Sequence, residues 1–225
     1  MRILVACEES QRVCMAFRDK GHEAYSCDLV EPSGGHPEWH ILGDVLPLLD
    51  GDCSFRTMDG QEHAVRGGWD MIIAHPPCTY LSNVATRHHS LRMTSLDKIN
   101  ARTEKRIEAM KLFMRFVNAK CRKIVIENPI GVMNTCYRRP DQIIDPYMFA
   151  ESEEDEDYVT KSTCLWIKGL PPLLTNQLPK PDNHKLFGTR PNGRAYTWED
   201  TYSRKASVRS KTFEGIARAM AEQWG

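Results

Sequence analysis

Two short apolar runs each end at proline, and each leads to a side chain capable of chemistry. Residues 71–74 lead through two prolines to Cys78, and residues 124–126 lead to Glu127 and Asn128. Proline cannot donate to a strand ladder, so each run is expected to be a strand that stops there. Because ligands of open α/β sheets bind at the carboxyl ends of strands, we expect the thiol and the carboxyl group to share one mouth.

A thiolate beside a carboxylic acid is an arrangement for covalent catalysis. The acid protonates a ring nitrogen while the sulfur adds to an adjacent electrophilic carbon. A cysteine is also often an inert core residue, and Asn128 fits a cap on the strand end equally well. The chemical interpretation therefore depends on Cys78 and Glu127 lying close together.

The elements that carry these side chains alternate between strand and helix. Strands are expected near residues 3–6, 23–27, 39–45, 71–74, 123–129 and 163–167, and helices after residue 10, over 102–119 and over 213–224. The strand–helix–strand unit from 71 to 129 predicts a right-handed parallel crossover. We therefore expect a Rossmann-like α/β fold, a mostly parallel sheet flanked by helices, with a hairpin or irregular insertion over 50–68 and a loop over 80–100.

The length of 225 residues predicts a single domain, in which residues 134–211 form a reduced, substrate-facing lobe. No apolar run is long enough to span a bilayer, and the N-terminus lacks the apolar region of a signal peptide. The eight cysteines are scattered, with no Cys-x-x-Cys pair, which favours reduced thiols and argues against a metal site. Together these features predict a cytoplasmic protein without a membrane partner or a metal ion.

The formal net charge is zero, but the charges are unevenly distributed. Residues 151–160 hold six acidic and no basic side chains, and we expect them to form a solvated, flexible excursion. Residues 161–225 hold 11 basic and five acidic side chains, a net of +6. Within them, the segment 185–211 interleaves basic and aromatic residues, which is compatible with a phosphate-bearing partner such as DNA. A solvated basic face explains the pattern almost as well.

Carboxylates also follow the first three expected strands. They are Glu8 or Glu9, Asp28 and Asp44. An acid at the end of the second strand of a nucleotide-binding sheet commonly takes ribose hydroxyls, although Asp is also a common strand terminator. The loop after the first strand lacks Gly-x-Gly-x-x-Gly, which argues against a dinucleotide.

The order Pro76-Pro77-Cys78 followed by Glu127-Asn128, each after an apolar strand, resembles the catalytic motifs of the DNA cytosine-5 methyltransferases. In that family the cysteine adds to carbon 6 of a flipped-out cytosine and the glutamate engages ring nitrogen 3. Carbon 5 then takes the methyl group of S-adenosyl-L-methionine, and elimination frees the enzyme.

The resemblance implies a fold of the class I S-adenosylmethionine-dependent methyltransferase type. It also implies catalytic roles for Cys78, Glu127 and Asn128, and for Lys161, which begins a stretch similar to the strand where the family carries paired arginines. Asp28 is similar to the family's ribose-binding acid and Asp44 to the acid that meets the adenine. The full set of implied cofactor-binding residues is Cys7, Glu8, Glu9, Ser10, Asp28, Leu29, Asp44, Val45, His75, Pro77 and Ser210.

Residues 141–147 and 161–172 resemble short phage and prophage proteins described as cytosine methyltransferase-like, which would act in the cytoplasm of a bacterial host. The sequence departs from the family in its first motif, where glycines are replaced by Cys7 to Ser10, in Thr79, and in Lys161 and Thr163, which stand in place of the arginines. It also lacks a large target-recognition domain, since fewer than 50 residues separate Trp166 from the last motif.

Sequence-specific reading of the major groove needs more surface than such a segment offers. Three hypotheses therefore stay open: methylation of cytosine in DNA, the same chemistry on a free pyrimidine nucleotide, and a catalytically idle relative that binds nucleic acid or a protein. DNA is the favoured substrate.

Overall fold

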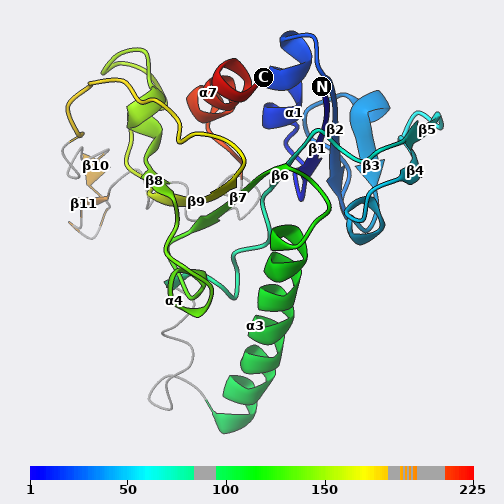
Figure 1. Ribbon diagram of the computed structural model, residues 1–225. Coiled ribbons are helices and arrows are strands. Elements are labelled where there is room, and N and C mark those ends of the chain that lie inside the picture. The colour runs from blue at the N-terminus through cyan, green and yellow to red at the C-terminus, as the bar shows by residue number, and fades with distance from the viewer. Residues whose placement is uncertain (84–94, 182–187, 190, 192, 194, 197–210) are drawn as a thin grey trace.

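The computed structural model describes residues 1–83, 95–181 and 211–225, and also residues 188, 189, 191, 193, 195 and 196. Seven strands form one sheet in the order β3-β2-β1-β6-β7-β9-β8 (Figure 1). The chain is therefore an α/β protein built on a mostly parallel sheet, as the sequence predicts.

Five neighbouring strands of the sheet are parallel, and the last two reverse. The parallel strands are β1 (Arg2–Ala6), β2 (Glu23–Asp28), β3 (His40–Leu42), β6 (Met71–Ala74) and β7 (Lys123–Pro129). Strand β9 (Thr163–Lys168) runs antiparallel to β7, and β8 (Gln142–Ile144) runs antiparallel to β9. The chain moves outward from β1 to β3 and then returns to β6 on the other side of β1. This reversal creates a topological switch point between β1 and β6, the place where open α/β sheets bind ligands.

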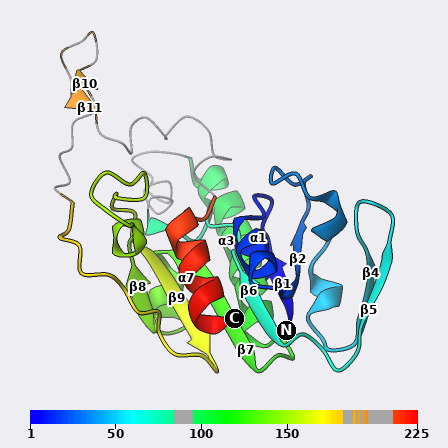
Figure 2. The same ribbon diagram turned by 90° about the horizontal axis from the view of Figure 1, so that it is seen from above.

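Successive side chains of the central strands point to opposite faces of the sheet and pack into two separate cores. Leu4 and Ile72 point to the face covered by α3 (Leu96–Val117), through its Phe113 and Phe116. The intervening residues, such as Val5, pack against α1 (Arg12–Asp19) and α7 (Glu214–Trp224) on the opposite face. Figure 2 shows the sheet between these two layers of helices. The final helix thus closes the fold by packing against the first strand and its helix.

The remaining described elements are short. They are the hairpin strands β4 (Cys53–Arg56) and β5 (Glu62–Val65), the helix α4 (Met133–Cys136), the strands β10 (Gly188–Thr189) and β11 (Ala195–Tyr196), and 3-10 turns at Pro37–Trp39, Leu46–Leu48 and Pro146–Phe149. The hairpin confirms the insertion expected over 50–68. Strands β8 and β9 belong to the main sheet, although they fall within the range 134–211 that was expected to form a lobe. In the ranges that the structure describes, no helix combines the length and apolarity needed to cross a membrane.

Two sequence-based expectations about elements are corrected. Helix α3 begins at Leu96, six residues before the predicted start, because its first turns lie outside the core and so carry no apolar periodicity; Leu96 itself is 59% exposed. The third strand covers residues 40–42 and not 39–45. A 3-10 turn over residues 37–39 precedes it, and the strand ends at Leu42, shortly before a second 3-10 turn over residues 46–48.

The acidic run is not wholly a solvated excursion. Asp157 is buried, and its carboxylate accepts a hydrogen bond of 2.6 Å from the backbone N–H of Gly215 in the first turn of α7. Glu151 forms a 3.0 Å ion pair with Arg218 of the same helix. A carboxylate is stabilised at a helix N-terminus by the unpaired amides there, which explains why part of the run folds inward.

Candidate active site

The loop that follows β6 is tied to the end of β7 on the N-terminal side of Cys78. His75 Nδ1 lies 3.2 Å from Glu127 Oε2, and the Asn128 side chain donates a 2.6 Å hydrogen bond to the carbonyl of Pro76. Asn128 is buried, and its hydrogen bond to Pro76 positions the Pro-Pro-Cys loop.

On the C-terminal side of Cys78, the same loop is tied to the segment that directly follows β7. The Val132 amide donates to the Leu81 carbonyl at 2.8 Å, and the Asn83 amide donates to the Ile130 carbonyl at 3.1 Å. Contacts from both sides of Cys78 thus run to the segment that carries Glu127. Cys78 itself is exposed at the head of a tight turn, in which its carbonyl accepts two amide hydrogen bonds of 3.0 Å. The loops that follow β6 and β7 are therefore paired, as the neighbouring positions of these two strands predict.

Gly131 sits where these two loops touch. It bridges to Ser82, and a Cβ atom at this position would collide with the backbone of Leu81 and Ser82. We expect Gly131→Ala to lower the free energy of unfolding by about 1–3 kcal/mol, the usual cost of overpacking, because backbone atoms must move apart. Urea unfolding measures the change, and an unaltered midpoint would contradict the close approach.

Glu127 is held from both sides by side chains of neighbouring strands. Thr163, the first residue of β9, donates its hydroxyl to Oε1, and His75 faces Oε2. The His75 side chain is 8% exposed and that of Glu127 is 23% exposed, so the glutamate keeps some contact with solvent.

The charges around this pair decide where its proton resides. Burial alone would raise the pKa of Glu127, but the hydrogen bond and charge of His75, the Thr163 hydroxyl and the Lys161 charge outweigh burial and lower it. Burial alone would lower the pKa of His75, but the hydrogen bond to Glu127 and the charges of Glu127 and Glu8 outweigh burial and raise it. The two shifts favour a carboxylate beside an imidazolium, a pair that keeps its shared proton to a higher pH than an isolated histidine would.

Two buried polar atoms beside this pair have no hydrogen-bond partner. They are Nε2 of His75 and Oδ1 of Asn128. Leaving such atoms unsatisfied costs about 1–3 kcal/mol each, and in native proteins they collect where a ligand or an ordered water binds. Both belong to the residues that join the two strand ends.

The loop after β1 has an unusual backbone. Cys7 has φ 58° and Gln11 has φ 60°, a left-handed conformation that costs a non-glycine residue about 1–2 kcal/mol. Between them, the buried Glu8 carboxylate accepts hydrogen bonds from the amides of Val13 and Cys14, at 2.7 and 3.2 Å. Glu8 therefore anchors the N-terminus of α1. The sequence-predicted cofactor residues of this loop lie at the carboxyl end of β1, but this carboxylate is engaged by the helix.

The aspartates that end β2 and follow β3 lie close enough to Cys7, which follows β1, for their charges to act on its thiol. Burial, and then the negative charges of Asp28 and Asp44, raise the pKa of the Cys7 thiol to about 12. Each aspartate also accepts a local amide hydrogen bond, from Val30 at 3.2 Å and from Leu46 at 3.0 Å respectively.

The other predicted cofactor residues differ in their exposure. Leu29 is 76% exposed, Val45 and Ser10 are buried, Glu9 is half-buried and Pro77 is exposed. Ser210 lies outside the described residues, as does most of the basic segment 185–211.

Sequence reasoning missed Gln11, which organises this end of the sheet. Its buried amide bonds to the Ser26 hydroxyl at 3.2 Å and to both backbone groups of His36, at 2.8 and 3.0 Å. The chain also returns here near its end, where Lys211 donates to the Ser33 hydroxyl and Arg12 to the Thr212 carbonyl. No sequence pattern marks these contacts, because each joins loops distant in the chain.

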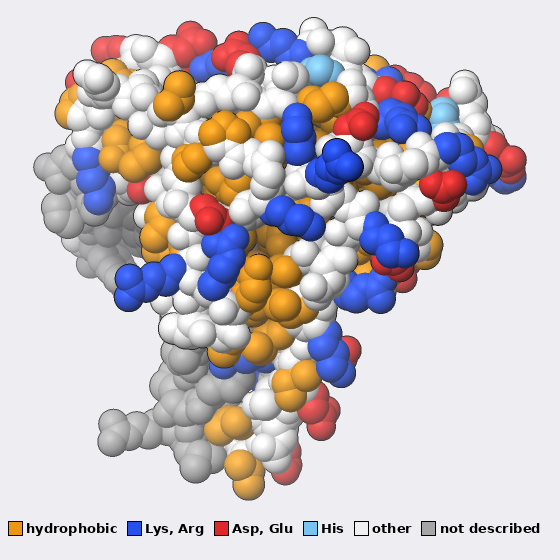
Figure 3. Space-filling model, viewed as in Figure 1, with side chains coloured by type: hydrophobic (Ala, Val, Ile, Leu, Met, Phe, Trp, Pro, Cys, Tyr) orange, Lys and Arg blue, Asp and Glu red, His pale blue; other side chains and the backbone are white. Residues whose placement is uncertain are grey.

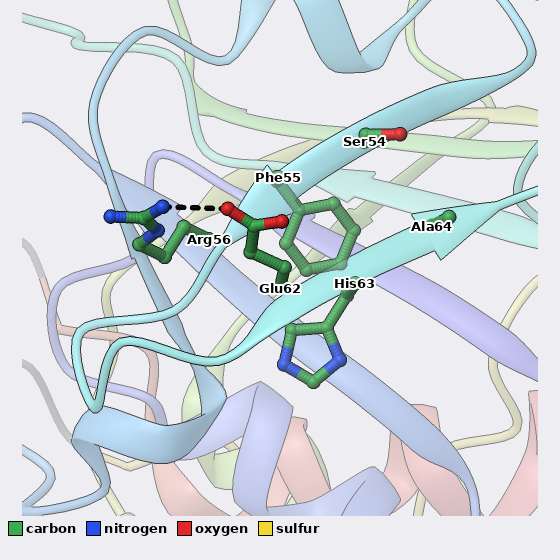
Figure 4. A pocket seen from close by; sticks show the side chains of 6 residues that line it. All are labelled: Ser54, Phe55, Arg56, Glu62, His63 and Ala64. Carbon is green, nitrogen blue, oxygen red and sulfur yellow. Dashed lines mark hydrogen bonds and ion pairs between the residues drawn. The ribbon is translucent and has the colours of Figure 1, made fainter.

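A hollow on the β4–β5 hairpin lies apart from these loops (Figure 4). It is lined by Ser54, Phe55, Arg56, Glu62, His63 and Ala64, and includes none of the predicted site residues. Arg56 and Glu62 form an ion pair of 2.6 Å across its edge, and Phe55 stacks on His63. The hairpin packs on the core through Tyr25 and Trp69, away from Cys78 and Glu127.

No protein-family model matches the sequence, and no curated protein matches it. Within the part of the chain that the structure describes, no three His, Cys, Asp or Glu side chains are grouped as metal ligands.

Proposed function

We propose that this protein transfers a methyl group from S-adenosyl-L-methionine to carbon 5 of cytosine in DNA. The observation that carries the proposal is the exposed Cys78, held on both sides by contacts to the strand end that bears Glu127. A nucleophile and an acid joined in this way suit addition to an electron-poor ring carbon next to a ring nitrogen.

The cofactor suits the residues around the switch point. S-adenosylmethionine supplies an electrophilic methyl group when it is bound. Asp28 and Asp44 offer acceptors for ribose hydroxyls and amino groups, and the exposed Leu29 offers apolar surface for a base. The left-handed backbone at Cys7 brings main-chain groups to the end of β1, and such strained residues often mark ligand sites. We infer a fold of the class I S-adenosylmethionine-dependent methyltransferase type.

The reaction can be written through the residues of this chain. The Cys78 thiolate forms a bond to carbon 6, the electrons of the C5–C6 double bond move toward carbon 5, and ring nitrogen 3 takes a proton. We assign that proton to the His75–Glu127 pair: it moves from His75 Nδ1 to the Glu127 carboxylate, which delivers it to ring nitrogen 3, while Thr163 holds the other carboxyl oxygen. Methyl transfer leaves S-adenosylhomocysteine. Carbon 5 then loses its proton to water, ring nitrogen 3 returns its proton to the His75–Glu127 pair, and the C–S bond breaks, which restores the thiolate. The positive charge of Lys161 helps to lower the pKa of Glu127 and so stabilises its carboxylate form.

The His75–Glu127 pair predicts how activity depends on pH. The pair holds its proton below the raised pKa of His75 and loses it as the pH rises through that value, which lies above the ordinary 6.5. We expect kcat to fall along an alkaline limb above pH 6.5, and His75→Gln to remove this limb together with most of the rate. His63→Gln, a histidine of the distant hairpin, should leave the pH profile unchanged; an unchanged profile in His75→Gln would refute the role of the pair.

Substrate class is tested by offering DNA and nucleotide to the same preparation. Radioactive methyl transfer from S-adenosylmethionine is measured to a cytosine-containing duplex and, separately, to deoxycytidine monophosphate, with the product identified by mass spectrometry. The proposal expects 5-methylcytosine in the duplex. Transfer to the nucleotide alone would support the second candidate, which the short segment between β9 and α7 favours because it leaves little surface to read a duplex. No transfer to either would favour a catalytically idle relative.

A further inference from the structure

Helix α3 is much longer than its contact with the sheet requires. Its 22 residues span roughly 33 Å at about 1.5 Å per residue. The C-terminal half is anchored by the buried Phe113 and Phe116, whereas Leu96 and Ile107 of the N-terminal half are 59% and 46% exposed. Figures 1 and 3 show this half extending away from the body of the molecule, with charged and apolar side chains on its visible face.

The extended half of α3 separates its charges onto two faces. Basic residues spaced three or four apart form one face: Lys98, Arg102, Lys105 and Arg106. Acidic residues at positions 97, 104 and 108 share another face, where Lys111 pairs with Glu108 at 2.8 Å. The basic face is continuous with Phe113 and Phe116, because positions 102, 105 and 106 lie on the same side of the helix as 109, 113 and 116. It is therefore turned toward the sheet side of the helix.

The basic face meets the loop that carries the nucleophile. The Arg102 guanidinium carbon lies 5.2 Å and Lys105 Nζ lies 5.8 Å from the ring centre of Tyr80. Arg106 Nε donates a 3.0 Å hydrogen bond to the Tyr80 carbonyl. Tyr80 is two residues beyond Cys78, so three cations are gathered next to the reacting loop.

Two of these cations, Arg102 and Lys105, have no acidic side chain to balance them in the described parts of the chain. Neither forms a salt bridge there, and Nε of Arg102 is buried with no hydrogen-bond partner. Burial and then the charge of Arg102 lower the pKa of Arg106, as expected where two guanidinium groups lie on neighbouring turns of one helix. Holding like charges side by side is unfavourable unless an anion binds between them.

We propose that Arg102 and Lys105, on the Tyr80 side of α3, bind backbone phosphates of the DNA strand that presents its cytosine to Cys78. This inference rests on the proposed function. Guanidinium groups pair with phosphate through two parallel hydrogen bonds, and phosphate contacts fix the position of a strand without reading its sequence. A cytosine that reacts with Cys78 must leave the base stack, which costs a few kcal/mol. Cations beside the reacting loop hold the flanking phosphates and so offset part of that cost.

The test compares two double variants that each remove two positive charges from α3. Arg102→Gln/Lys105→Gln alters the proposed site, and Lys111→Gln/Arg115→Gln alters the acidic face, where these residues pair with Glu108 and Asp50. Binding of a fluorescein-labelled, cytosine-containing duplex is measured by anisotropy over a range of salt concentrations. For the first variant we expect about tenfold weaker binding near 100 mM salt and a log–log salt slope shallower by about 1.8, or about 0.9 for each phosphate that is no longer neutralised. The control should stay within about twofold of the parent.

The outcomes separate this site from the proposed reaction. Equal affinities and slopes for the two variants, or a parent that does not bind the duplex, would overturn the phosphate site. A selective weakening in the first variant, in a protein that forms no 5-methylcytosine, would support the phosphate site and refute the methyl transfer. Both variants change exposed or half-exposed side chains, and matching thermal unfolding curves verify that each is folded.

Discussion

Replacing Cys78 with alanine is expected to abolish methyl transfer to cytosine while cofactor and DNA binding persist. The sulfur forms the bond to carbon 6 that makes carbon 5 nucleophilic. Cys164 of β9 also lies beside the Glu127 strand end, opposite Asn128, but it is buried, whereas Cys78 is exposed. Loss of a covalent nucleophile typically lowers kcat by about 10⁴-fold or more. The rate is measured by radioactive methyl transfer, and binding by calorimetry.

Cys136 provides the matched control for this variant. It is the other exposed cysteine of the described chain, and Cys136→Ala should keep the parent rate. Residual transfer by Cys78→Ala above one per cent of the parent rate, or an equal loss in both variants, would contradict the assignment of the nucleophile.

Glu127→Gln is the second large expected effect. The amide preserves the shape of the side chain and can still accept from Thr163, but it neither carries the charge that raises the pKa of His75 nor passes a proton to ring nitrogen 3. General acid catalysis contributes about 10²–10⁴-fold, so we expect kcat to fall by that factor with little change in cofactor affinity.

Asp157→Asn separates this chemical effect from a general effect of removing a buried acid. The Asp157 carboxylate accepts a hydrogen bond from the first turn of α7 and has no part in the proposed reaction. Asp157→Asn should therefore lower the stability of the protein but leave kcat of the folded protein unchanged. If Glu127→Gln lost stability but retained kcat, as expected of Asp157→Asn, Glu127 would be a structural residue rather than an acid.

The central strands were predictable because their physical cause is local. The apolar runs 71–74 and 124–126 are each followed within three residues by proline, and β6 and β7 form at these runs. The start of α3 was not predictable in the same way, because periodicity reports burial and its first turns are exposed. Strand β8 has three residues and owes its existence to pairing with β9, a contact that no local pattern encodes.

In the candidate site, too, features with a local cause were predictable and contacts made by strand pairing were not. That Cys78 and Glu127 share one edge followed from the parallel order of two strands. The partners of Glu127 did not, because Thr163 reaches it through the antiparallel pairing of β7 with β9, and His75 reaches it across the pairing of β6 with β7. His75 and Glu8 were predicted to bind cofactor. The structure gives His75 a contact with Glu127 and Glu8 a place at the start of α1.

The most direct measurement of the proposed chemistry is covalent trapping on an oligonucleotide that contains 5-fluorocytosine. Fluorine at carbon 5 blocks the final elimination, so a thiolate that has added to carbon 6 remains bound after denaturation. We expect an adduct that requires S-adenosylmethionine, persists in Cys136→Ala and is absent from Cys78→Ala. A preparation that binds both cofactor and oligonucleotide but forms no adduct, or an adduct that survives Cys78→Ala, would contradict the account.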